Sequence, residues 1–174
     1  MIPVIALPTA DDTRALGARI AGLVRAGDLI VLDGPLGAGK TVFVQGLAAG
    51  LGASGRVTSP TFVIARVHEG GRLPLVHVDA YRLMGRLEVD DLDLDTDLTA
   101  AVVAVEWGAG LVEGLTDAHL RVQLERGEGS EGSEGSEGSE GGEGGEGERT
   151  AVLHPSGGDW AGRLASAGFA VGAS

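Results

Sequence analysis

The sequence contains no cysteine, few aromatic residues and a single lysine. Without cysteine the chain forms neither disulfides nor thiolate metal sites, which fits a reducing compartment. Aromatic residues make up 3% of the chain and hydrophobic residues 43%, so aliphatic side chains must build the core. The N-terminus lacks a basic segment followed by a long apolar one, and no apolar run is long enough to span a bilayer. We therefore expect a cytoplasmic protein without membrane association.

Positive charge is also scarce, because 13 basic residues face 25 acidic ones and the net charge is −12. Eight of the glutamates lie in one segment, residues 127–148, which contains only Gly, Ser and Glu. Removing these eight charges leaves −4 on the rest of the chain. We find no basic stripe that would hold a nucleic-acid backbone unaided.

The acidic segment repeats with a period of three and has no apolar side chain to bury, so it cannot offset the entropy cost of ordering. We interpret residues 127–148 as a disordered insert. The segments HLRVQLE before it and RTAVLHP after it alternate apolar and polar residues, which predicts a hairpin whose turn the insert replaces. A spacer is the favoured interpretation, and an acidic tether for a partner or for solubility is the alternative.

The remaining residues, 1–126 and 149–174, are predicted to form one α/β domain. Apolar residues recur with helical spacing in three segments, which are Asp11 to a stop at Gly27, about 39–51, and 158–168. Short apolar runs predict strands at 28–34, at 100–108, and on both sides of the turn 69–72. Buried strands that alternate with helices favour a partly parallel sheet, and the hairpins make it mixed.

The segment GPLGAGKT follows the first buried strand and precedes the second helix, and it fits the pattern G-x-x-x-x-G-K-[ST]. Its glycines permit backbone angles and close approach that a Cβ would block. Successive N–H groups can then surround phosphate oxygens, and the helix N-terminus adds partial positive charge. We predict a phosphate-binding loop made of Gly34, Pro35, Leu36, Gly37, Ala38, Gly39, Lys40 and Thr41.

The single lysine of the chain, Lys40, lies in this loop. A compact ammonium can reach the β- and γ-phosphates from beneath, whereas the planar fork of arginine is wider. The hydroxyl of Thr41 is an oxygen ligand of the kind that Mg²⁺ prefers. Guanine-specific enzymes usually carry an N-K-x-D signature, which is absent because the lysine is already used. The sequence therefore favours ATP with Mg²⁺ over GTP.

Two acidic residues end apolar strands, Asp79 in LVHVD and Glu106 in VVAVE. Ligands of open α/β sheets sit beyond the carboxyl ends of the parallel strands. Either carboxylate can hold Mg²⁺ directly or through water, or orient the attacking water. A solvated acid at a strand end is the alternative for both. His77 lies two residues before Asp79, and we interpret it as a buried, hydrogen-bonded side chain rather than a catalytic one.

The segment VTSPTF offers the hydroxyls of Thr58, Ser59 and Thr61, which can sense a terminal phosphate as switch loops do. A capped turn is the alternative. Trp107 follows Glu106 directly, and it either packs on a nucleotide-sensitive loop or fills the core. Arg82 can pair with an acid or approach phosphate.

These segments together resemble a known family. GPLGAGKT, VTSPTF, HVDAYRL and VEWG, in this order and spacing, are similar to the bacterial TsaE family, small ATPases required for the threonylcarbamoyladenosine (t6A) modification of tRNA. The match covers residues 4–125 and resumes at Arg149. The resemblance implies a P-loop NTPase-type three-layer α/β domain with a mixed, mostly parallel sheet. One departure is the run 108–110, Gly-Ala-Gly, where family members often carry an acid.

The resemblance also implies roles for the site residues. Thr41 and Glu106 would coordinate Mg²⁺, and Asp79 would position or activate the hydrolytic water. Thr61 would belong to a switch-like loop at the nucleotide, and Trp107 would lie near the nucleotide-responsive region. The acidic insert is atypical, and we expect it to lie away from the nucleotide.

The implied partners are the TsaD and TsaB proteins, with tRNA contacted only indirectly through their complex. TsaD would transfer the threonylcarbamoyl group to adenosine 37 of tRNAs that read codons beginning with A, and ATP hydrolysis by this chain would reset the complex. No internal arginine finger is evident, and arginines supplied in trans can accelerate hydrolysis by about 10³–10⁵. We therefore expect slow hydrolysis by the isolated chain.

Two other functions are compatible with a phosphate loop. A small-molecule kinase would need an acceptor pocket and a lid with arginines, for which Arg82 and Arg86 are the nearest candidates. A nucleotide-gated scaffold would bind ATP without useful turnover. Products separate the first alternative from an ATPase, and the effect of Glu106→Ala on turnover separates the second.

Overall fold

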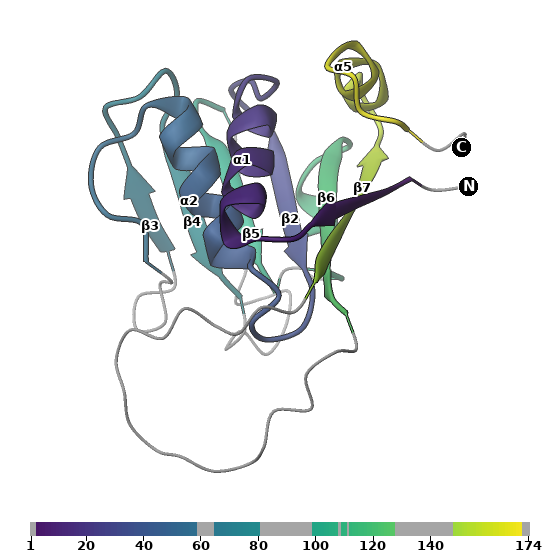
Figure 1. The fold of residues 1–174 in the computed structure, drawn as a ribbon. Coiled ribbons are helices and arrows are strands. Elements are labelled where there is room, and N and C mark those ends of the chain that lie inside the picture. Colours follow the sequence, from purple (N-terminus) through teal and green to yellow (C-terminus); the bar gives the residue numbers. More distant parts are fainter. Residues whose placement is uncertain are drawn as a thin grey trace.

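The computed structural model describes residues 3–58, 65–80, 99–107, 109–110, 112–127 and 148–171. Its strands are β1 (Val4–Leu7), β2 (Leu29–Asp33), β3 (Ala65–His68), β4 (Leu75–Asp79), β5 (Val102–Glu106), β6 (His119–Arg126) and β7 (Arg149–Ser156). Its helices are α1 (Ala10–Ala21), α2 (Lys40–Leu51), α5 (Trp160–Ser166) and the short 3₁₀ helix η1 (Glu113–Leu115). All seven strands form one sheet in the order β1-β7-β6-β2-β5-β4-β3 (Figure 1).

The sheet is mixed, as the sequence predicts. The four central strands β6, β2, β5 and β4 run parallel to one another. The outer pairings, β1 with β7, β7 with β6, and β4 with β3, are antiparallel. Every residue of β5 is buried, and so are the first four of β2 and of β4. Continuous burial of this kind is typical of parallel strands covered on both faces.

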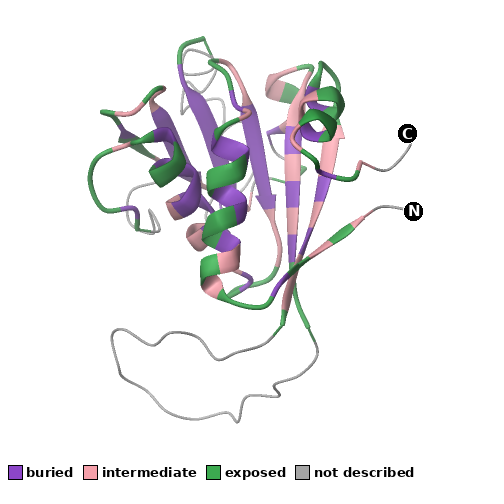
Figure 2. Cartoon of the chain, turned by 45° about the horizontal axis from the view of Figure 1, so that its top comes forward, coloured by how far each residue is buried: buried purple, intermediate pink, exposed green. Residues whose placement is uncertain are grey.

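Helices α1, α2 and α5 join one hydrophobic cluster with one face of the sheet, and Figure 2 shows the buried residues concentrated in the central strands. The opposite face has its own cluster, in which Val31, Val103 and Val105 pack with Val112 and with the partly buried Leu115 of η1. Among the described helices, η1 is the one that contributes to this second cluster. In the described parts of the chain, no helix has the length and apolar character needed to cross a membrane.

Helix α1 begins and ends for local reasons. Thr9 caps its N-terminus in a capping box with Asp12. The predicted stop at Gly27 was wrong, because the helix ends at Ala21 with Gly22 as its C-cap. The backbone N–H of Arg25 instead donates to the Asp28 carboxylate at 2.7 Å, which holds the following residues in a turn before β2. The edge strand β1 was not predicted, since four residues give little periodic signal.

Helices α1 and α2 approach each other closely at glycines. A Cβ on Gly46 would lie 2.0 Å from the carbonyl oxygen of Arg14, and one on Gly17 would lie 2.2 Å from that of Phe43. Because any side chain there would overlap backbone, only glycine permits this crossing. The contact fixes α2, and with it the loop that precedes α2, against the rest of the domain.

Candidate functional site

The predicted phosphate loop connects the carboxyl end of β2 to the N-terminus of α2. Gly34 has a φ of 144°, and a Cβ there would lie 2.2 Å from the carbonyl oxygen of Leu124. Gly39 is the N-cap of α2 with a φ of 101°, and no side chain caps this helix. The first N–H groups of α2 therefore remain available to an anion, as a helix N-terminus in a phosphate site requires.

Lys40 lies inside this loop and is only 5% exposed. Its ammonium donates hydrogen bonds to the carbonyl oxygens of Gly34, at 2.7 Å, and Pro35, at 2.9 Å. The same ammonium lies 3.7 Å from the ring centre of Trp107. Burial lowers the pKa of Lys40, and the neighbouring carboxylates, above all Glu106, oppose this shift. The loop thus buries the Lys40 ammonium and binds it through the backbone carbonyl groups of Gly34 and Pro35.

Glu106, at the end of β5, is the most constrained acid of the site and is only 3% exposed. Its Oε1 accepts a hydrogen bond from the hydroxyl of Thr41 at 2.9 Å. Its Oε2 lies 2.5 Å from Nε2 of His77. Asp79 faces Glu106 across the β4–β5 ladder as its Cα partner. The structure therefore brings Thr41, Glu106 and Asp79 to one edge of the sheet, where the parallel strands end.

His77 is buried and hydrogen-bonded, as predicted, with no exposed surface. An ionised carboxylate only accepts hydrogen bonds, so the ring donates to Glu106 from Nε2. This contact orients one oxygen of the carboxylate, while Thr41 occupies the other. The histidine accordingly acts on the site through Glu106.

Trp107 has a φ of 62° and is the one non-glycine residue with positive φ in the described ranges. Its backbone N–H donates to the carbonyl oxygen of Leu32 at 3.1 Å, which ties the end of β5 to β2. A bulky residue in this conformation stores strain, and such strain concentrates at functional sites. Here it turns the chain so that the indole ring covers Lys40.

The structure does not reach every predicted residue. Ser59, Thr61 and Arg82 lie outside the described residues, so their predicted places at a nucleotide stay predictions. Thr58 is described and exposed. The preceding residue, Val57, offers its carbonyl oxygen to the side-chain amide of Gln45 on α2 at 3.2 Å, which brings this segment beside the helix that follows the phosphate loop.

Sequence reasoning missed Asp33, the last residue of β2. Its carboxylate accepts from the guanidinium of Arg121 at 2.8 Å, and its charge acts on Lys40. The sequence contained a pattern that could have indicated this residue, because Asp33 ends an apolar strand in the same way as Asp79 and Glu106. The edge of the sheet around Lys40 therefore carries three carboxylates rather than two.

Sequence reasoning also missed two arginines that flank the acidic insert. Arg126 ends β6, Arg149 begins β7, and the two are Cα partners. The Arg126 guanidinium lies 3.7 Å from the position a Cβ would take on Gly37, and Cδ of Arg149 lies 3.8 Å from that on Gly39. The hairpin that bears the insert therefore opens beside the phosphate loop, because β6 runs parallel to β2 and both end at the same edge. Arg126 thus lies beside this loop. Residues 128–147 of the insert lie outside the described residues, so its expected position away from the nucleotide stays a prediction.

The donor set fits magnesium bound with a nucleotide. In the part of the chain that the structure describes, no group of three or more His, Asp or Glu side chains could hold a metal by itself. Mg²⁺ is usually held by one or two protein oxygens together with substrate phosphates and waters. The hydroxyl of Thr41 and the carboxylate of Glu106, already in contact with each other, supply such a pair.

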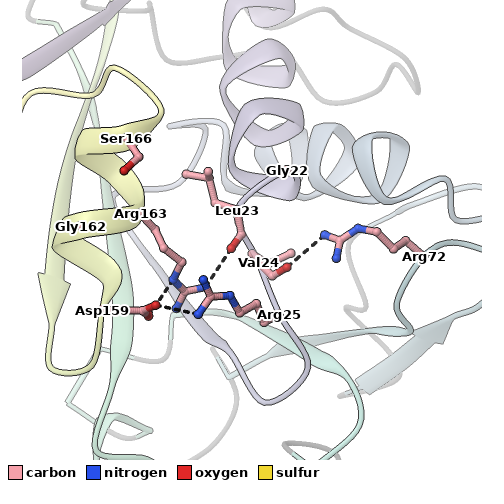
Figure 3. A pocket seen from close by; sticks show the side chains of 9 residues that line it. All are labelled: Gly22, Leu23, Val24, Arg25, Arg72, Asp159, Gly162, Arg163 and Ser166. Carbon is pink, nitrogen blue, oxygen red and sulfur yellow. Dashed lines mark hydrogen bonds and ion pairs between the residues drawn. The ribbon is translucent and has the colours of Figure 1, made fainter.

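A separate pocket of about 600 Å³ lies between the end of α1 and α5 (Figure 3). Its charged groups are already engaged, since Arg25 pairs with Asp159 at 2.6 Å, Arg163 pairs with Asp28 at 2.6 Å, and Arg72 donates to the carbonyl oxygen of Val24 at 3.0 Å. The pocket adjoins the residues that precede β2, whereas the phosphate loop follows β2. It therefore belongs to the other end of the parallel strands, where its ion pairs hold α5 against the segment between α1 and β2.

Comparison with known proteins bears on this site. The family model described as "Threonylcarbamoyl adenosine biosynthesis protein TsaE" matches residues 7–133. The chain is 60% identical over 119 residues to the tRNA threonylcarbamoyladenosine biosynthesis protein TsaE of Streptomyces coelicolor, covering 67% of this chain and 80% of that protein. It is 39% identical over 117 residues to the protein of the same name in Bacillus subtilis, covering 67% and 73%. The crystal structure of Bacillus subtilis YdiB superposes with a TM-score of 0.70 at 25% identity, covering 97% of this chain and 96% of that one.

Proposed function

The chain belongs to the TsaE family of threonylcarbamoyl adenosine biosynthesis proteins, and we propose that it is a Mg²⁺-dependent ATPase serving the t6A modification of tRNA. The observation that carries this proposal is the meeting of a buried lysine, a hydroxyl and a buried carboxylate at the head of α2. Lys40, Thr41 and Glu106 come from two segments 65 residues apart, yet Thr41 and Glu106 are in direct hydrogen-bond contact.

In the proposed mechanism the protein works by positioning and electrostatics, as is usual for phosphoryl transfer. The N–H groups of the loop and the ammonium of Lys40 hold the phosphate chain, and Thr41 and Glu106 hold Mg²⁺. Mg²⁺ held by Thr41 and Glu106 would supply positive charge that offsets the charge on the phosphate oxygens. Lys40 exchanges its bonds to the two loop carbonyls for bonds to phosphate, so little reorganisation of the backbone is needed.

Asp79 is proposed to position the attacking water. Asp79 is the last residue of β4 and is paired with Glu106. Its carboxylate therefore belongs to the same end of the sheet as the proposed metal ligand. Glu106 is held at both oxygens by Thr41 and His77, which suits a fixed metal ligand better than a group that must accept a proton. Asp79 is therefore the better candidate for orienting water.

The proposed partners are the TsaD and TsaB proteins, whose complex this ATPase would reset between turnovers. Contact with tRNA would be indirect, which agrees with a net charge of −12 and with the lack of a basic stripe in the sequence. The isolated chain should hydrolyse ATP slowly and faster in the partner complex. Equal rates in both states would contradict this coupling.

The decisive experiment measures t6A formation on tRNA by purified TsaD and TsaB, with threonylcarbamoyl donor and Mg-ATP, with and without this chain. We expect multiple turnovers only when the chain is present, and none with Lys40→Ala. Release of free phosphate, without a phosphorylated metabolite, separates an ATPase from a kinase.

A matched pair of variants tests the metal site. Thr41→Ser keeps the hydroxyl and should keep Mg²⁺-dependent turnover, whereas Thr41→Ala removes it and should raise the Mg²⁺ concentration needed. If both variants respond to Mg²⁺ like the unmodified protein, Thr41 is not a metal ligand.

A further inference from the structure

Several acidic side chains lie near the phosphate loop, which contains a single lysine. Asp33, Asp79 and Glu106 end the neighbouring parallel strands β2, β4 and β5, at the end of the sheet where Lys40 begins α2. Arg121 pairs with Asp33 and offsets one of these charges. A nucleoside triphosphate would add several further negative charges to this edge of the sheet. Additional positive charge beside the loop would therefore favour the binding of such a ligand.

Arg126 lies in the right place to supply it. Arg126 is the last residue of β6, and the pairing of β6 with β7 holds its backbone opposite Arg149. One terminal nitrogen of its guanidinium lies 3.7 Å from the position that a Cβ on Gly37 would occupy. Gly37 and its neighbour Leu36, which is 87% exposed, form the outer part of the loop. The guanidinium therefore lies beside the exposed part of the loop.

We propose that Arg126 is a phosphate-contacting residue of this site, an arginine that the chain supplies to its own loop. This inference rests on the proposed binding of Mg-ATP. A guanidinium presents a planar fork of donors that matches phosphate oxygens in pairs, while the ammonium of Lys40 acts as a point charge from within the loop. The two cations would thus hold the phosphate chain from different sides, and the hairpin end fixes the position of the second.

The test compares Arg126→Ala, Arg126→Lys and a control, Arg66→Ala. Arg66 is exposed on β3, at the opposite edge of the sheet from the β6–β7 hairpin. Calorimetry at low salt should show Mg-ATP binding weakened about tenfold or more by Arg126→Ala, as expected for a lost charge-assisted hydrogen bond. Arg126→Lys should retain part of the affinity, and Arg66→Ala should bind as tightly as the unmodified chain.

Salt separates a phosphate contact from a structural role. The deficit of Arg126→Ala should shrink in about 1 M KCl, where charges are screened within about 3 Å. A deficit that is unchanged by salt, or full affinity in a folded Arg126→Ala variant, overturns the inference. Absence of Mg-ATP binding by the unmodified chain would instead refute the proposed function itself, so the two failures are distinguishable.

Discussion

The imidazole Nε2 of His77 lies 2.5 Å from Oε2 of Glu106, and neither side chain exposes more than a few per cent of its surface. The two residues come from neighbouring parallel strands, β4 and β5. A buried carboxylate costs free energy unless it is paired and hydrogen-bonded. The hydrogen bond from His77 therefore stabilises the buried Glu106 carboxylate beside the phosphate loop in the absence of a metal ion.

Replacing His77 with alanine should destabilise the nucleotide-free protein. It leaves the Glu106 carboxylate buried with one oxygen unpartnered, and breaking a buried pair typically costs about 3–5 kcal/mol. Urea unfolding measures this loss directly. The double variant His77→Ala with Glu106→Gln should recover part of the stability, because the uncompensated charge is gone. An equally unstable double variant would show that the imidazole matters for packing alone.

Nucleotide binding should change the fluorescence of Trp107. The Lys40 ammonium lies over its ring, and binding of Mg-ATP would draw the ammonium toward phosphate. The chain has one other tryptophan, Trp160, which is fully buried in α5, so the measurement uses a Trp160→Phe background. We expect a saturable change in emission on titration with Mg-ATP. The same titration of a Lys40→Ala variant is the control and should give no change.

The crossing of α1 and α2 should not tolerate a methyl group at Gly46. A Cβ there would lie 2.0 Å from the carbonyl oxygen of Arg14, so the helices must separate. We expect Gly46→Ala to lower the free energy of unfolding by about 1–3 kcal/mol or more. Gly162→Ala in α5 is the matched control, because nothing lies within 4 Å of its Cβ position. It should stabilise the helix by up to about 1 kcal/mol; similar effects of both substitutions in thermal unfolding would contradict the close crossing.

His68 should make the protein less stable in mild acid. It is 7% exposed on β3, and burial lowers its pKa, with the charges of His77 and Arg66 acting in the same direction. As the pH falls through 6.5, the unfolded chain binds a proton that the folded chain does not yet accept. Stability therefore falls below that pH, by at most about 1.4 kcal/mol per pH unit, and levels off below the folded pKa.

The variant His68→Gln tests this dependence. Urea midpoints from about pH 7.5 to about pH 5 should fall less steeply for the variant than for the unmodified protein. Parallel curves would mean that His68 takes up its proton equally well in both states.

The sequence by itself determined most of the local elements, apart from β1 and the end of α1. The loop from Gly34 to Thr41 was predicted in its place between β2 and α2, because its residues are contiguous and its glycines permit the backbone angles that the turn needs. Its binding of phosphate stays a prediction. The bounds of β2 and α2 followed from the same segment. His77 was also predicted correctly, since a polar residue inside the apolar run LVHVD must find a partner when the strand is buried.

Only the tertiary structure decided which chain segments meet around that loop. The order of the strands places the end of β6 beside the end of β2, so Arg126 and Arg149 flank the loop and the acidic insert begins there. The pairing of His77 with Glu106 depends on the register of β4 against β5. Register and strand order come from the packing of residues far apart in the sequence, whereas periodicity and turn residues report only on near neighbours.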